Sequence, residues 1–248
     1  MGTNDFQREY KRLERYISRI SQQGVQLPES DHIALLLNGL GSSSHDLSLA
    51  ALTQAVKPTY DPALFSYRKV GEPYTPADIQ KTPDEVSRLI DAHFDSTQAT
   101  NVCLLGYSLG GIGLAYWLTR NGLKHLSRID RIVFVATPVW IIAPSESTFP
   151  TLGRLLHEYS FDWPAFESLV LPRVECLVLR CEVGADRLFK YGERWMSFEA
   201  REISLEDLDL QEHSIPDVDH FNICPNQVTA KVLGAWIHGD EAAARELS

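Results

Sequence analysis

A single serine lies in the stretch of this sequence that is best suited to covalent chemistry. Ser108 is the middle residue of the segment GYSLG at 106–110, so glycines stand two positions before it and two positions after it. The apolar run 102–105 predicts a buried strand before this segment, and the run 112–118 predicts a helix after it. Glycines at these positions remove side chains that would collide in a tight turn from strand to helix. Such a turn holds the serine hydroxyl out above the sheet.

The predicted helix after the turn begins next to Ser108 and directs its N-terminal amides at negative charge that forms there. The amide of Leu109 is therefore a predicted oxyanion donor. In this strand, turn and helix the sequence resembles the α/β-hydrolase superfamily, whose nucleophile elbow has the same form. The resemblance extends over residues 32–238. It implies an α/β fold with a mostly parallel central sheet and helices on both faces, in a single domain that comprises residues 1–248.

A second glycine-rich turn follows the predicted apolar strand 32–37. In the α/β-hydrolase superfamily the loop at this place usually reads His-Gly-x, and the residue after the glycine supplies the second oxyanion donor. By this match the donor is the amide of Leu40, which follows Gly39. Asn38 stands in place of the family's histidine, and this difference leaves the role of the backbone intact.

The resemblance also implies a catalytic acid after the predicted strand 174–180 and a catalytic base before the last helix. Asp186 is the best match for the acid, and Glu182 is the alternative. The acid has to accept a hydrogen bond from the imidazole and stabilise the imidazolium that forms. His220 matches the base and completes the order serine, acid, histidine along the chain. His213 is the nearby alternative, but it precedes the closing helix by too many residues.

Residues 139–172 interrupt the alternation of strands and helices and are rich in aromatic residues and proline. These residues follow the predicted strand 131–136. In the superfamily the segment after that strand commonly carries a cap over the active site. An aromatic insertion predicts a lid that lines an apolar or acyl pocket. The alternative is a pair of surface helices packed on the core. The resemblance implies substrate contacts at Gly39, Tyr107, Trp140 and Trp163.

The remaining sequence alternates predicted strands and helices, which indicates parallel strands joined by right-handed crossovers. Thr82, Pro83 and the two acidic residues after them have the residue types of a helix start. Predicted helices cover residues 4–23, 47–56, 82–95 and 225–238, and further predicted strands cover 63–68, near an edge of the sheet, and 131–136.

The composition excludes several classes of function. The chain has 33 acidic and 23 basic residues, a net charge of −10, which argues against nucleic acid or an anionic membrane as a partner. No apolar run is long enough to span a membrane, so we expect a cytoplasmic protein. Histidine and cysteine show no ligand spacing and there is no phosphate-binding loop, so we expect no metal and no cofactor. Reduced, structural thiols are expected at Cys103, Cys176, Cys181 and Cys224.

These features predict a serine hydrolase that cleaves an ester or thioester through an acyl-enzyme at Ser108. The substrate would be a small molecule or an acyl group linked to a carrier. One alternative is an acyltransferase, a cyclase or a C–C bond lyase of biosynthetic metabolism with the same triad. Another is a non-catalytic ligand-binding protein, against which the intact set of Ser108, Asp186 and His220 argues. The sequence does not define the acyl length or the oligomeric state.

Overall fold

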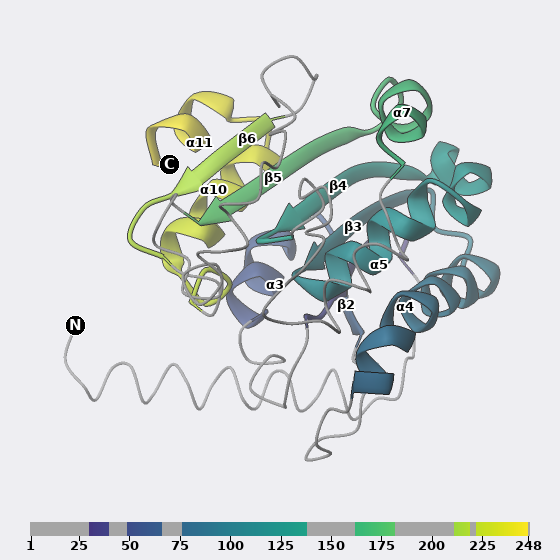
Figure 1. Ribbon diagram of the computed structural model, residues 1–248. Helices are drawn as coiled ribbons and strands as arrows, with labels where there is room; N and C mark the ends of the chain where they lie inside the picture. Colours follow the sequence, from purple (N-terminus) through teal and green to yellow (C-terminus); the bar gives the residue numbers. More distant parts are fainter. Residues whose placement is uncertain are drawn as a thin grey trace.

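The protein has an α/β architecture in which helices cover both faces of one sheet (Figure 1). This confirms the predicted fold class. The helix predicted at 4–23 lies outside the residues that the structure describes. The computed structural model describes residues 30–39, 49–65, 76–137, 162–181, 211–218 and 222–247.

The sheet has six strands in the order β2-β1-β3-β4-β5-β6, and every neighbouring pair is parallel. The arrows in Figure 1 accordingly point the same way. The carboxyl ends of all six strands therefore meet at one edge, where ligands bind in open α/β sheets. The strands are β1 (His32–Leu37), β2 (Asp61–Phe65), β3 (Asn101–Tyr107), β4 (Ile129–Val135), β5 (Glu175–Cys181) and β6 (Gln211–Ile215).

The larger helices form two layers on the sheet. Helices α4 and α5 contribute to the hydrophobic cluster on one face, and α3 and α10 to the cluster on the other. The described helices are α3 (Ala50–Val56), α4 (Pro76–Ser96), α5 (Leu109–Leu118), the 3₁₀ helix η1 (Asn121–Arg128), α7 (Trp163–Ala165), the π-helix η2 (Phe166–Val170), α10 (Gln227–Ile237) and α11 (Glu241–Leu247).

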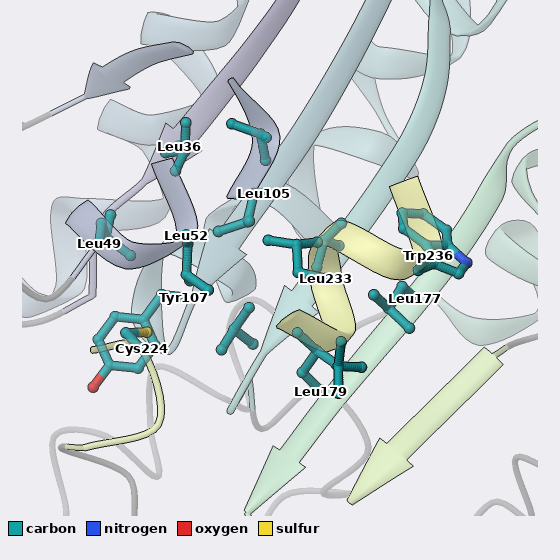
Figure 2. Packing of buried hydrophobic residues seen from close by; sticks show 14 of the residues in the cluster. Leu36, Leu49, Leu52, Leu105, Tyr107, Leu177, Leu179, Cys224, Leu233 and Trp236 are labelled. Atoms are coloured by element: carbon teal, nitrogen blue, oxygen red, sulfur yellow. The ribbon is translucent and has the colours of Figure 1, made fainter. Parts of the chain in front are cut away.

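The central strands are buried on both faces, as β1 illustrates. Ile33 and Leu35 belong to the cluster with α4 and α5, whereas Ala34 and Leu36 belong to the other cluster. All four residues have 0% exposure, so β1 is an uninterrupted apolar run rather than an alternating one. Figure 2 shows the second cluster, in which Leu36 and Leu105 of the sheet lie near Leu52 of α3 and Leu233 of α10.

Arg128 connects the end of α4 to the start of β4. Its Nε donates to the carbonyl of Ala99 at 2.8 Å, and its two Nη atoms donate to the carbonyls of Phe94 and Thr97 at 2.9 and 2.6 Å. The guanidinium also lies over the Phe94 ring, 4.8 Å from its centroid. The carbonyls at the end of a helix have no partner within the helix, and here one side chain satisfies the carbonyl of Phe94 and two that follow in the chain.

A chain of polar contacts connects the amino-terminal ends of β4 and β5. The Tyr60 hydroxyl donates to Oδ2 of Asp130 at 2.6 Å. Arg131 donates from Nη1 to the Tyr60 hydroxyl and from Nε to Oε2 of Glu175, both at 3.0 Å, and lies over the Trp236 ring. Burial and the hydrogen bond to Asp130 raise the pKa of Tyr60, so the phenol stays a neutral donor.

The structure corrects the predicted start of one helix and the bounds of one strand. Helix α4 begins at Pro76, and Pro83, predicted to open the helix, lies inside it. Either proline has the residue type that suits the first turn of a helix. Because Pro83 has no N–H, its position inside α4 leaves the helix with one backbone hydrogen bond fewer. Strand β2 begins at Asp61 rather than at residue 63, and it is an edge strand as predicted.

Strand β6 and the residues before β5 add details that the sequence did not reveal. No strand was predicted at Gln211–Ile215. In the described end of the predicted cap, residues 162–172, Phe166 and Val170 have 0% exposure and belong to the core cluster with α4 and α5. The first part of the predicted cap, 138–161, lies outside the described residues, and a cap stays a prediction.

The four cysteines are free, as predicted. Burial raises the pKa of the thiols of Cys103, Cys176 and Cys224, which are enclosed in the core. Protonated, buried thiols of this kind behave as small apolar side chains and are poor nucleophiles.

Candidate active site

Ser108 lies in a strained turn between β3 and α5. Its φ is 50° and its ψ is −119°, and it precedes Leu109, the first residue of α5. A residue other than glycine rarely adopts a positive φ, and such a conformation costs about 1–3 kcal/mol and persists only where the surrounding structure maintains it. Ser108 is 9% exposed, and its side chain makes no capping hydrogen bond to the helix. This is the geometry that the predicted nucleophile elbow requires.

Backbone hydrogen bonds fix Ser108 from both sides. Its N–H donates to the carbonyl of Val135 on β4 at 3.0 Å. Its carbonyl accepts from the amides of Gly111 and Ile112 at 3.0 and 3.2 Å, which joins it to the first turn of α5. The turn is therefore attached both to the neighbouring strand and to the helix. The N-terminal end of α5, with its partial positive charge, lies directly beside the serine.

The glycines of the segment GYSLG are required by space. A methyl group on Gly106 would lie 2.5 Å from Cα of Gly111 and 2.9 Å from its nitrogen. A methyl group on Gly110 would overlap the carbonyl oxygen of Asn38, which follows β1. Both obstacles are backbone atoms, which cannot move aside as a flexible side chain can. The pattern that suggested an elbow thus has a steric cause in the folded protein.

The chain after β1 passes close to Ser108. A methyl group on Gly39 would lie 3.0 Å from Cβ of Ser108 and 2.9 Å from two ring carbons of Tyr107. The next residue, Leu40, lies outside the described residues, so its amide stays a predicted oxyanion donor. The position of Gly39 is consistent with this prediction because it brings the loop to Ser108.

The predicted acid and base follow strands that end at the same edge as β3. Glu182 directly follows β5, and Asp186 comes four residues later. His220 follows β6 and lies between the described residues Val218 and Asn222. All three of these candidates lie outside the described residues. The sheet order β3-β4-β5-β6 nevertheless places their points of attachment two and three strands from β3, or about 10 and 15 Å at the usual strand spacing.

His213, the alternative base, lies within β6. It pairs with Leu179 of β5 and is 6% exposed. Burial, together with the charge of Arg245, lowers the pKa of His213. A histidine inside a strand does not belong to the loop at the carboxyl edge, which agrees with the preference for His220.

The predicted substrate contacts have different positions. Tyr107 is 1% exposed and belongs to the cluster with α3 and α10, where Figure 2 shows its ring near Cys224. Its ring therefore packs in the core, and a contact with substrate stays a prediction. Gly39 lies beside Ser108, as described above. Trp140 lies outside the described residues, and Trp163 is the first residue of α7, before the start of β5.

Two residues after β4 belong to this site and were not identified from the sequence. Ala136 has a φ of 43°, and Thr137 is 3% exposed with its hydroxyl oxygen 3.1 Å from the carbonyl oxygen of Gly106. The only sequence signal was a small residue and a threonine directly after an apolar run. That signal is common and does not single out these positions.

A cavity of about 960 Å³ opens at the opposite edge of the sheet from Ser108. It is lined by residues at the amino-terminal ends of β4 and β5, among them Asp130, Arg131 and Glu175. Arg131 is already paired with Glu175, and ligands of parallel sheets bind at the other edge, so we do not assign the chemistry to this cavity.

Within the described ranges, no group of three or more His, Cys, Asp or Glu side chains is arranged to hold a metal ion. None of the helices described there has the length and apolar character needed to cross a membrane.

Comparison with solved structures gives similarities over most of the chain. Est1E from Butyrivibrio proteoclasticus, determined with ferulic acid bound, has a TM-score of 0.57 and 10% identity, covering 88% of this chain and 92% of that one. A bromoperoxidase from Bacillus anthracis has a TM-score of 0.52 and 14% identity, covering 86% and 90%. A lipase-esterase related protein from Clostridium acetobutylicum has a TM-score of 0.50 and 15% identity, covering 85% and 94%. No protein-family model and no curated protein sequence matches the chain.

Proposed function

Because the chain has the α/β-hydrolase fold, we propose that it is a serine hydrolase that cleaves an ester or thioester through an acyl-enzyme at Ser108. The observation that carries the proposal is the conformation of Ser108. A φ of 50° in a buried turn between a strand and a helix is costly, and a protein with no use for a serine held in this position has no reason to maintain it. The similarity to a lipase-esterase related protein supports an ester as the substrate class.

The proposed reaction has two halves. His220 removes the proton from the Ser108 hydroxyl as its oxygen attacks the carbonyl carbon, and Asp186 orients His220 and stabilises the imidazolium. The amides of Leu109 and Leu40 donate to the oxyanion of the tetrahedral intermediate. The imidazolium then protonates the leaving alcohol or thiol, which leaves an acyl-enzyme. Water attacks this ester in the second half, with His220 again as the base, and the acid product departs from Ser108.

The geometry around Ser108 supports this assignment of roles. The amide of Leu109 is at the positive end of α5, directly after the nucleophile, and Gly39 brings the loop with Leu40 to within contact of the Ser108 side chain. The acid and base follow β5 and β6, on the side of β3 opposite to β1. The predicted acid and base are thus attached on one side of β3 and the loop with the predicted donor Leu40 on the other, which supports the proposed division of roles.

The experiment that tests the proposal is the intact mass of the protein after exposure to a fluorophosphonate, compared with the variant Ser108→Ala. We expect one adduct on the natural protein and none on the variant, because only an activated serine reacts at a useful rate. A panel of p-nitrophenyl esters and acyl thioesters of increasing acyl length then defines the substrate class, with product masses to separate hydrolysis from transfer. If neither protein forms an adduct, the assignment of Ser108 as a nucleophile is wrong.

A further inference from the structure

We propose that Thr137 is a positioning residue for the nucleophile, which acts from the strand beside the elbow; this inference rests on the proposed function. Thr137 follows β4 after one intervening residue and is 3% exposed. Its side chain lies against the first turn of α5. A methyl group on Gly111 would overlap Oγ1 of Thr137 and would lie 2.5 Å from its Cγ2. The threonine thus fills the space that the glycine leaves open.

The hydroxyl of Thr137 connects the two backbone groups that determine the position of Ser108. Oγ1 is 3.1 Å from the carbonyl oxygen of Gly106 and 3.2 Å from that of Val135. Gly106 is the residue from which the chain enters the elbow, and the Val135 carbonyl also accepts the N–H of Ser108 at 3.0 Å. A hydroxyl has one proton to donate, so the two carbonyls share it, and the one side chain contacts both.

The backbone before Thr137 is bent so that this contact can form. Ala136 adopts a φ of 43°, in the left-handed region, and its N–H donates to the carbonyl of Leu179 on β5 at 2.9 Å. A positive φ at alanine is unfavourable, so the packing on either side has to maintain it. Two residues with a positive φ, Ser108 and Ala136, therefore lie at the ends of neighbouring strands, and the Thr137 side chain lies against the first turn of the helix that follows Ser108.

This arrangement has a consequence for reactivity because a strained turn relaxes when a contact that maintains it is removed. The hydroxyl of Thr137 limits the movement of Gly106 relative to Val135, whereas the γ-methyl only fills space beside the first turn of α5. Displacement of a nucleophile by even 1 Å costs up to about a hundredfold in rate. The effect should fall on the chemical step rather than on substrate binding, since Thr137 acts through the elbow and not through the substrate.

The test compares Thr137→Val, which keeps the branched shape but loses the hydroxyl, with Thr137→Ser, which keeps the hydroxyl but loses the methyl group. For each we would measure the rate constant for labelling of Ser108 by a fluorophosphonate, and kcat and KM for the best ester of the panel. We expect Thr137→Val to lower the labelling rate and kcat by about tenfold or more, with KM changed by less than about twofold. We expect Thr137→Ser to keep both rates within about threefold of the natural protein.

The melting temperature of each variant would be measured, and all assays would be run well below it. A lower rate then reflects the position of Ser108 and not a smaller amount of folded protein. If Thr137→Val does not fold, Thr137→Ala takes its place in the comparison with Thr137→Ser, because it also lacks the hydroxyl. Unchanged kcat and labelling in the hydroxyl-free variant, or equal losses in both variants, would overturn the role of the hydroxyl while leaving the proposed function intact. Absence of labelling in the natural protein would overturn both.

Discussion

Gly39 passes so close to Ser108 that a methyl group on its α-carbon would lie 3.0 Å from the β-carbon of the serine. A contact of this length is tighter than nine in ten real contacts of a β-carbon. The same methyl group would lie 2.9 Å from the ring of Tyr107, which is enclosed in the core and has little room to move. The loop after β1 and the turn after β3 therefore fit together only with glycine at position 39.

Gly39→Ala should lower kcat/KM for an ester by about a hundredfold. The added methyl group forces the loop away from Ser108 and moves the amide of Leu40, the proposed oxyanion donor, and loss of one such donor costs about 10²–10³ in kcat. The φ of Gly39 lies outside the left-handed region, so the loss reports a collision and not backbone strain. Steady-state kinetics on the ester panel measures it, and activity equal to that of the natural protein would remove this loop from the site.

Gly234→Ala is the matched control. Gly234 lies inside α10, and the nearest atom to an added methyl group is the carbonyl oxygen of Ala55, at 4.0 Å. Glycine in the middle of a helix is less stable than alanine by about 0.5–1 kcal/mol. The variant should therefore keep full activity and gain about this amount in its free energy of unfolding, which urea denaturation would measure.

Replacement of the proposed acid should distinguish Asp186 from Glu182. Asp186→Ala is expected to lower kcat by about 10³-fold or more, because the imidazole loses the group that fixes its tautomer and stabilises its charge. Glu182→Ala should leave kcat within a few fold. Both side chains follow β5, so each variant controls for general disturbance of that loop. The opposite ranking would transfer the role to Glu182.

Arg128→Lys should destabilise the fold without a direct effect on catalysis. Arg128 donates to one carbonyl in the last turn of α4 and to two that follow the helix, and a lysine ammonium cannot reproduce the planar fork that reaches all three. We expect the free energy of unfolding to fall by about 2 kcal/mol. Arg173→Lys is the control, because the exposed Arg173 donates to one carbonyl, that of Leu169. Equal stability of both variants would show that the three bonds of Arg128 contribute little.

The stability of the fold should decrease between pH 6.5 and pH 4 because of His93. Burial, aided by the nearby charge of Arg128, lowers the pKa of His93 from 6.5 to about 4. The unfolded chain therefore binds a proton at a higher pH than the folded protein does. Stability is complete above pH 6.5, is lost as the pH falls towards 4, and the loss from this histidine reaches about 3 kcal/mol.

His93→Gln removes the titrating group, so its urea midpoint should depend less steeply on pH over this range than that of the natural protein. His93 lies in the last turn of α4, and 1% of it is exposed. Comparison at pH 7.5, where the histidine is neutral, gives the cost of the substitution itself. Parallel pH profiles for the two proteins would assign the acid lability to other groups.

The sequence predicted those elements whose structure depends on local pattern and burial on both faces. Strands β1 and β3 are continuous apolar runs because helices cover both faces of the sheet, and the glycines around Ser108 are required by contacts within the turn and with the loop after β1. Strand β6 has the polar sequence QEHSI and pairs with β5 alone among the described strands, so its own residues carry little signal. Helix α4 has two prolines that suit a first turn, and the sequence did not reveal which one begins it.

The surroundings of Ser108 could be predicted only in part. The motif gave Ser108, the candidate nucleophile, and the glycines. The contact of Thr137 with Gly106 joins residues 31 positions apart, and the left-handed Ala136 donates to the distant Leu179 on β5. Neither depends on a local preference. They follow from where β4 ends relative to β3, which only the folded sheet determines.

The pairing of β3 also sets the order in which the elbow is completed during synthesis. His32 of β1 pairs with Asn101, so β3 has a partner as soon as it leaves the ribosome. The carbonyl that holds the Ser108 amide belongs to Val135, which is made later, with β4. A nascent chain that stops before β4 contains Ser108 but lacks the carbonyl that accepts its amide in the strained turn. The turn at Ser108 is therefore complete only after β4 has been made and has paired with β3.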